Sequence, residues 1–262
     1  MTLFLHELRT NRLAIIIWSG VISFMLGVCI VIYPEMAPQM TEMTDMFADM
    51  GSFTSAFGMD QLNIGEFKGY FVIECGNVLG LGGAFFAAIL GISALAKEER
   101  DGTAEFLLTH PITRRRVISE KLLSVGVEIV IMNASVMLVS LLGMAAIGEL
   151  ATFGSIILVF ISYILMQLEI GAITFGISAF VRRGAMGIGI GLAFLMYFLN
   201  IVSNLAKEAE FLKFITPFGY TEGGDIIADN TILWKYLITG VIFAAVAIYI
   251  AYFKYEKKDI LL

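Results

Sequence analysis

A polar segment between two long apolar stretches, residues Glu98–Arg114 (EERDGTAEFLLTHPITR), carries the residue types of a docking element. Gly102 permits a sharp turn, and Thr103 can cap a helix whose first turn holds Glu105, where the helix dipole favours an acid. Pro111 would end this helix, because proline disfavours helical conformation in the residue before it. The pattern predicts a short amphipathic helix that fits an apolar groove in a partner protein. Its apolar side chains would be Phe106, Leu107 and Leu108.

The same segment can also be explained without a partner. Glu98 and Glu99 lead it, Thr113 can cap the long helix that follows, and Arg114 opens a run of three arginines. A basic run beside an apolar helix is what an ordinary inner loop of a membrane protein carries. Both interpretations place the segment on the cytoplasmic side of a membrane.

Several acidic and amide side chains fall inside the apolar stretches, where a charge is costly unless it faces the protein interior or water. Glu169 lies near the middle of its stretch, too deep for its carboxylate to reach the membrane surface. Such side chains either hydrogen-bond neighbouring helices or line a polar path for a substrate. The residues that can line such a path are Glu74, Asn77, Glu128, Asn133 and Glu169.

Enzyme chemistry has little support in the sequence. A nucleotide-binding P-loop requires a Gly-Lys-Ser or Gly-Lys-Thr step, and the chain contains none. An intramembrane protease needs a metal triad or an acid pair on facing helices, but the HExxH motif is absent and both histidines lie outside the apolar stretches. Two Cys and two His also argue against a structural zinc site. We expect no catalytic residue, metal or cofactor in this chain, so that any ATP and magnesium would be bound by a partner.

Membrane-spanning helices are the elements that would position these residues. The chain has 262 residues, of which 58% are hydrophobic, and its mean hydropathy of +0.86 is unlike that of a soluble domain. Its apolar runs approach or exceed the roughly 20 residues that cross a bilayer. The sequence therefore predicts an all-α membrane protein with one domain over residues 1–262. The six spans are expected at Leu13–Tyr33, Tyr70–Ala96, Ile118–Ile147, Phe153–Val181, Ala185–Ser203 and Leu233–Phe253.

The distribution of Lys and Arg predicts the orientation of these spans, because positive loops stay in the cytoplasm. An even number of spans places both termini on one side. Thirteen of the 17 basic residues belong to that side: Arg9, Arg12, Lys97, Arg100, Arg114, Arg115, Arg116, Lys121, Arg182, Arg183, Lys254, Lys257 and Lys258. The other side holds four: Lys68, Lys207, Lys213 and Lys235. We expect cytoplasmic termini, and no basic and aromatic patch suggests nucleic-acid binding.

Two segments beside the first span are predicted to be amphipathic helices. Residues Thr2–Arg12 mix apolar and charged side chains and suit a short elbow helix on the inner leaflet. In the first outer loop, an apolar stripe with helical spacing predicts a helix over residues 35–58. The stripe consists of Met36, Met40, Met43, Phe47, Met50 and Phe57. Because thioethers bind Cu(I) and flexible methionine faces accept varied lipophilic molecules, copper handling and cargo contact stay open beside simple packing.

Small residues mark places where helices can approach each other closely. Gly187 and Gly191 form a GxxxG face on the predicted fifth span, and Ala185 and Gly189 form a second small-residue pair. Packing within the chain and contact with a second copy are both consistent with these faces.

The string KEERDGTAEFLLTHPITRRRVISEKLL resembles the pattern E-x-x-x-G-T-x-E-x-L-L-x-x-P-[ILV]-[ST]-R of ABC-2 type permeases, the membrane subunits of ABC exporters. The matching residues are Glu98, Gly102, Thr103, Glu105, Leu107, Leu108, Pro111, Ile112, Thr113, Arg114 and Lys121. The N-terminal residues Leu3–Arg9 and the tail Phe253–Ile260 are also similar to that family. The resemblance implies that the polar segment is a coupling helix between the second and third spans. The residues that would engage the ATPase are Glu98, Glu99, Gly102, Thr103, Glu105, Phe106, Leu107, Leu108, Pro111, Thr113 and Arg114.

The resemblance further implies a permease that pairs with a second permease copy, as a homodimer or a related heterodimer, and binds a separate ABC ATPase subunit. Its location would be the bacterial cytoplasmic membrane, in contact with lipid. Compact members of that family export drugs and amphipathic or antimicrobial peptides, so the expected substrate is lipophilic or amphipathic. A permease-like subunit of a copper-related maturation system is the alternative, followed by a membrane-embedded enzyme.

Overall fold

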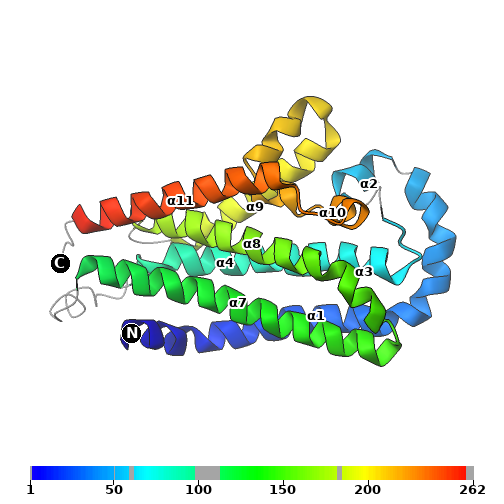
Figure 1. Cartoon of the computed structure of the whole chain (residues 1–262), viewed down its shortest axis with the longest axis horizontal. Coiled ribbons are helices and arrows are strands. Elements are labelled where there is room, and N and C mark those ends of the chain that lie inside the picture. Colours follow the sequence, from blue (N-terminus) through cyan, green and yellow to red (C-terminus); the bar gives the residue numbers. More distant parts are fainter. Residues whose placement is uncertain (1, 50, 59–61, 98–112, 182–184, 258–262) are drawn as a thin grey trace.

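The computed structural model describes residues 2–49, 51–58, 62–97, 113–181 and 185–257. Within these ranges the chain is helical and contains no strand. Six helices are long and apolar enough to cross a membrane, which confirms the predicted class (Figure 1). These helices cover Leu3–Glu42, Phe67–Ala94, Arg114–Ile147, Leu150–Ser178, Met186–Leu205 and Trp234–Lys257.

The first helix differs from the prediction. Helix α1 runs without a break over Thr2–Asp49 and contains Pro34 and Pro38, so the expected ends at Arg12 and Pro34 are both wrong. An elbow helix separate from the first span is therefore not seen. Each proline removes one backbone hydrogen bond, but a helix remains the way to pair the other backbone groups in an apolar environment. Figure 1 shows α1 bending at one end of the bundle, the usual consequence of prolines inside a helix.

The predicted outer-loop helix over residues 35–58 is thus divided between the last turns of α1 and a short helix, α2 (Ser52–Ala56). Met36 and Met40 are half-buried, and Phe57 is exposed. The other members of the apolar stripe, Met43, Phe47 and Met50, lie outside the residues whose side chains are described. The structure therefore leaves their role as a prediction.

The second span is divided into three parts that the sequence did not distinguish. Helix α3 (Phe67–Cys75) passes into a π-helical turn, η1 (Gly76–Gly80), and then into α4 (Leu81–Ala94). Tyr163 of the fourth span packs against this turn: a Cβ on Gly76 would lie 3.0 Å from its hydroxyl, and one on Gly80 3.1 Å from its ring. Single π-helical turns occur frequently at functional sites, and this one lines a cavity described below.

The remaining spans match their predicted positions within a few residues. Helix α7 (Arg114–Ile147) has Thr113 as its predicted N-cap, whose hydroxyl accepts a hydrogen bond from the Arg116 amide at 3.4 Å. It ends at Gly148, whose φ of 84° suits a residue without a side chain. A short 3-10 turn, η2 (Leu150–Thr152), leads into α8 (Phe153–Ser178). The last two spans are α9 (Ala185–Leu205) and α11 (Trp234–Lys257).

Helices α4 and α8 form the centre of the bundle, with α1 packed on α7, α9 on α4 and α11 on α8. Gly91 permits the α4–α8 contact, since a Cβ there would lie 2.3 Å from the carbonyl oxygen of Gly171. Gly189 of α9 likewise packs on α4, where a Cβ would meet Ile92 at 2.8 Å. Gly187 and Gly191 have nothing within 4 Å of a Cβ, so the two predicted small-residue faces differ: one packs inside the chain and one is open.

The connection between α9 and α11 is also structured. It contains two 3-10 helices, η3 (Lys207–Phe214) and η4 (Pro217–Tyr220), and a short helix, α10 (Gly223–Asp229). All four residues of η4 are buried. Thr216 fixes this turn by accepting from the Phe218 amide at 3.3 Å and donating to the Met196 carbonyl at 2.7 Å.

The two ends of the bundle differ in which helices begin and end there. We call one the basic end: there α1 and α7 begin and α11 ends, joined by hydrogen bonds from the Phe4 amide to Glu120 and from Arg114 to the carbonyl of Tyr255. We call the other the far end, where α7 ends and α8 begins and where α1 bends (Figure 1). The first and last described residues lie together at the basic end, as an even number of spans predicts.

Candidate functional site

Buried charges gather at the basic end. Lys121 of α7 is 0% exposed, and its Nζ lies 2.8 Å from Oε1 of Glu7 on α1. Lys97, just after α4, lies 3.7 Å from the other carboxylate oxygen of Glu7. Asn11 donates to both carboxylate oxygens of Glu128 at 3.1 Å and accepts from Lys97 at 3.5 Å. We call these five residues the basic-end cluster, which connects α1 and α7 to the end of the second span.

The basic-end cluster adjoins the predicted coupling segment. Thr113 caps α7, and Arg114 donates through Nη1 to the carbonyl oxygens of Tyr255 and Glu256 at 3.2 and 3.0 Å. The first turn of α7 is therefore held to the last turn of α11. The other predicted coupling residues lie outside the described residues: Glu98, Glu99, Gly102, Thr103, Glu105, Phe106, Leu107, Leu108 and Pro111.

The five predicted path residues do not converge on one site. Glu128 belongs to the basic-end cluster. Asn133 of α7 donates to Oε1 of Gln167 on α8 at 2.6 Å, and Gln167 donates to the carbonyl of Leu79 at 3.3 Å. This chain of amides links α7, α8 and the π-helical turn, so Asn133 has the helix-bridging role. Glu74 is half-buried and accepts from the Cys29 thiol at 3.8 Å, so it faces α1.

Glu169 lies in an apolar groove between α7, α8 and α11. Its Oε2 accepts a hydrogen bond from the Tyr220 hydroxyl at 2.8 Å, and a Cβ on Gly240 would lie 2.1 Å from the same oxygen. The groove has a volume of about 310 Å³. Apolar side chains line most of it: Leu122, Val125, Ile129, Leu165, Leu168, Ala172, Leu237, Val241, Ala244 and Ile248. A carboxyl group in such a groove has the chemistry to accept a hydrogen bond from an apolar molecule that carries a donor.

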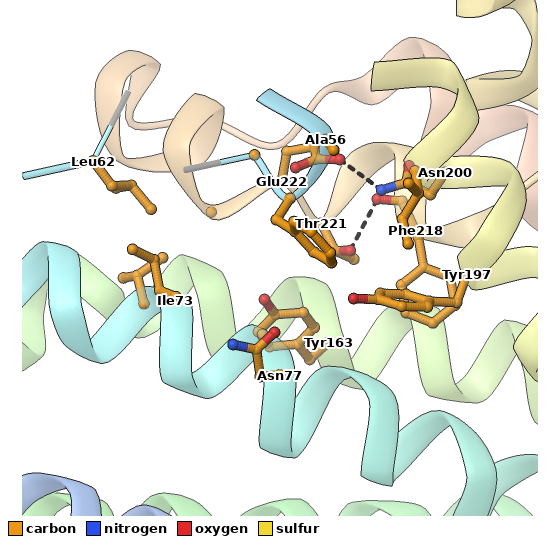
Figure 2. Close-up of a pocket in the computed structure, with 16 residues that line it drawn as sticks. Ala56, Leu62, Ile73, Asn77, Tyr163, Tyr197, Asn200, Phe218, Thr221 and Glu222 are labelled. Carbon is orange, nitrogen blue, oxygen red and sulfur yellow. Dashed lines mark hydrogen bonds between the residues drawn. The ribbon is translucent and has the colours of Figure 1, made fainter. Parts of the chain in front are cut away.

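Asn77, the fifth of these residues, lines a cavity at the far end (Figure 2). The cavity has a volume of about 60 Å³ and lies between the π-helical turn, α8, α9 and the segment around η4. Four aromatic residues line it: Phe57, Tyr163, Tyr197 and Phe218. The rings of Tyr197 and Phe218 are in an edge-to-face contact with centroids 5.4 Å apart. Figure 2 shows the hydroxyl of Tyr197 directed towards Tyr163, with Glu222 above both.

Glu222 is the acidic residue of this cavity. Its Oε1 accepts from Nδ2 of Asn200 and from Nδ2 of Asn204, both at 2.7 Å. Burial raises the pKa of Glu222 above its ordinary value, while the two amide hydrogen bonds and the charge of Lys213 act in the opposite direction. Gly58 approaches Glu222 so closely that a Cβ would lie 2.0 Å from Oε2, and its φ of 63° also favours glycine.

A wider polar cleft of about 240 Å³ adjoins the cavity and shares Glu222 and Gly58 with it. Its charged residues are Lys207, Glu210, Lys213, Glu222 and Asp225. Two lysines against three carboxylates give the cleft a formal charge of −1. The carboxylate of Glu222 thus lies where the open cleft meets the aromatic cavity.

Sequence reasoning missed Glu7, Gln167 and Glu222. Glu7 and Gln167 are separated from their partners by many residues, and no local pattern pairs them. Glu222 lies two positions after the string TPFGY of residues 216–220. This string contains a capping threonine, a proline and two aromatic residues, a combination that is unusual for a solvated loop. That string was the available signal that the outer connection packs into the bundle.

Comparison with known families gives one whole-chain result: the model described as "ABC-2 family transporter protein" matches residues 1–260. Comparisons with curated proteins and with solved structures give no match.

Proposed function

The chain belongs to the ABC-2 family of transporter proteins, and from that premise we propose that it is the membrane permease subunit of an ATP-driven exporter. The whole-chain family match carries this proposal. A separate ABC ATPase would bind and hydrolyse ATP with magnesium, and this chain would convert the resulting movement into passage of a substrate. The bacterial cytoplasmic membrane is the proposed location, with both termini in the cytoplasm because the basic end holds most of the positive charge.

The connections at the basic end support a mechanical role for the segment between α4 and α7. Lys97, just before this segment, and Lys121, soon after it, both lie beside Glu7 of α1. Arg114 connects the start of α7 to α11. A displacement of the coupling segment by an ATPase would therefore move α1, α7 and α11 together, which is how one docking event could tilt several spans.

The substrate we propose is lipophilic or amphipathic, such as a drug, a peptide toxin or an antimicrobial peptide. The apolar groove at Glu169 supports this class, because its volume reaches the lower range of pockets for drug-sized molecules. A second permease copy is part of the proposal. The open face of α9 at Gly187 and Gly191, beside the exposed side chains of Met186 and Ile190, offers a surface on which another helix could pack.

The decisive experiment changes Leu107 to Asp, which would put a charge into the apolar groove of the ATPase. We expect the loss of about 2 kcal/mol or more of binding free energy, measured by co-purification of the ATPase chain and by ATP-driven transport. Thr103→Ala is the milder companion, with a loss of about 1 kcal/mol through the missing helix cap. Membrane insertion should persist in both variants. Full ATPase binding and transport with Leu107→Asp would refute the coupling role of this segment.

A further inference from the structure

In the far-end cavity, the hydrogen-bond partners of the Glu222 carboxylate among the described residues are neutral amides, while Lys213 acts on it from the adjoining cleft. Among the described residues, Glu222 receives hydrogen bonds from Asn200 and Asn204, and no cation forms an ion pair with it. Both amides reach the same oxygen, Oε1. The other oxygen, Oε2, faces Gly58, where the missing side chain leaves it room. A carboxylate held in this way is a counter-ion for a positively charged ligand.

A second acceptor in the cavity has no partner in the described structure. Asn200 is 8% exposed and lines the cavity, and its Oδ1 forms no hydrogen bond although its Nδ2 is engaged by Glu222. A buried amide oxygen without a donor costs free energy, so Oδ1 of Asn200 is available to accept a hydrogen bond from a ligand in the cavity. The hydroxyl oxygens of Tyr163 and Tyr197, on the opposite wall, can accept as well (Figure 2).

The volume and the aromatic walls limit what the ligand can be. About 60 Å³ is enough for an ammonium group and its first methylenes but not for a whole drug molecule, whose pockets have about 300 Å³ or more. Aromatic rings attract a cation to their negatively charged faces, so the aromatic lining, which includes Tyr163 and Tyr197, is compatible with a positively charged group. The connection to the wider polar cleft provides room for the rest of a ligand with a longer alkyl chain.

We propose that this cavity binds the primary ammonium group of an alkylamine, with Glu222 as its counter-ion and with Asn200, Tyr163 and Tyr197 as further acceptors. An –NH₃⁺ group has three donors and no acceptor, which matches a carboxylate oxygen, an amide oxygen and a phenolic oxygen. A divalent metal fits less well, because calcium takes six or more oxygen ligands and the described residues that line the cavity supply one carboxylate. A guanidinium group has five donors in a wide planar fork and needs more acceptors and space.

The test is calorimetric titration of the purified full-length chain in lipid nanodiscs with butylamine. We expect saturable binding that Glu222→Gln weakens at least tenfold, because glutamine keeps the two amide hydrogen bonds but removes the charge. Gly76→Ala should also weaken binding while leaving every charge in place, since its methyl group would lie 3.0 Å from the Tyr163 hydroxyl. Glu149→Gln is the matched control, because Glu149 is another half-buried far-end carboxylate that hydrogen-bonds a side chain, Thr152.

Three further ligands distinguish the possible explanations. Butanol should not compete, because it lacks the charge, and butyltrimethylammonium should bind at least tenfold more weakly, because it lacks the donors. Nα-acetyl-lysine amide separates the sources of the amine: binding as tight as that of butylamine points to a peptide side chain, and weaker binding points to small free amines. Equal binding of butylamine by the wild type and by folded Glu222→Gln would overturn the proposal, and so would the absence of saturable binding.

This site does not depend on the proposed export activity, since the titration uses neither ATP nor a partner. Failure of the coupling experiment with normal butylamine binding would refute the permease mechanism alone. Normal coupling without butylamine binding would refute the ammonium site alone.

Discussion

The carboxylates of Glu7 at the basic end and Glu222 at the far end have different partners. At the basic end, Glu7 lies within 4 Å of two lysines, Lys97 and Lys121. At the far end, Glu222 is held by two amides and adjoins a cavity and an open cleft. Paired charges fix helices to one another, whereas a carboxylate paired only with amides keeps the capacity to meet a further cation. The two regions therefore suggest a mechanical role at one end and a binding role at the other.

The largest expected effect is at the basic end, where Lys121→Met removes a fully buried cation. Among the described residues, Glu7 would then keep the more distant Lys97, at 3.7 Å, as its ion-pair partner. Breaking a buried ion pair from one side usually costs several kcal/mol, so we expect a loss of about 3 kcal/mol or more in the free energy of unfolding. Thermal unfolding of the purified protein in detergent measures it.

The double variant Lys121→Met with Glu7→Leu is the control for this prediction. Replacing both charges by apolar groups of similar volume should recover most of the loss, because neither charge is left buried alone. An unfolding midpoint of Lys121→Met equal to that of the wild type would show that the basic-end cluster does not hold the bundle together.

At the far end the matching change, Glu222→Gln, should have a smaller effect on stability and in the opposite direction. Glutamine retains an oxygen that accepts from both amides, and it removes a charge that burial makes unfavourable. We expect between no change and about 1 kcal/mol of stabilisation near neutral pH. A loss as large as that of Lys121→Met would erase the distinction between the two ends.

The pH dependence of stability tests the charge of Glu222 in a second way, because the direction of the change can be predicted. Because the pKa of Glu222 is higher in the folded protein than its ordinary value, the folded state binds the proton more tightly than the unfolded state. The contribution of Glu222 to stability therefore increases as pH falls through the raised pKa and is complete below the ordinary value. Lys213 and Asp225 act on this pKa in opposite directions. Unfolding curves over this range should lose that slope in Glu222→Gln, and an unchanged slope would contradict the assignment.

The sequence predicted the class of fold and the positions of most spans because each apolar run contains its own signal. Hydropathy and length located α7, α8, α9 and α11 within a few residues. The same reasoning failed at Pro34, where a proline was expected to end the helix that continues to Asp49. A local rule gave the wrong result there because a proline inside a helix can bend it without ending it.

The polar contacts could be predicted only in part. Thr113 was recognisable as a cap because its partner is three residues away. The pairing of Glu7 with Lys121 spans 114 residues, and that of Glu169 with Tyr220 spans 51, so both depend on how the helices pack. For the same reason the sequence could offer five polar residues as path candidates but could not show that they lie at different places in the bundle. Depth within a span is visible in a sequence, whereas the direction in which a side chain points in the bundle is not.

The smallest expected effect concerns an exposed ion pair at the basic end. Arg116 lies 2.8 Å from Glu120 one helical turn later, and its side chain is 59% exposed. Solvent screens such a pair and both side chains lose conformational freedom in forming it, so Arg116→Gln should change the free energy of unfolding by no more than about 0.5 kcal/mol. Glu120 also accepts from the Phe4 amide at 3.0 Å, a contact that this variant leaves in place. The same unfolding measurement therefore separates buried from exposed charge within one region. If Arg116→Gln destabilised the protein as much as Lys121→Met, the strength of the basic end would come from its total positive charge and not from the buried pairing of Glu7.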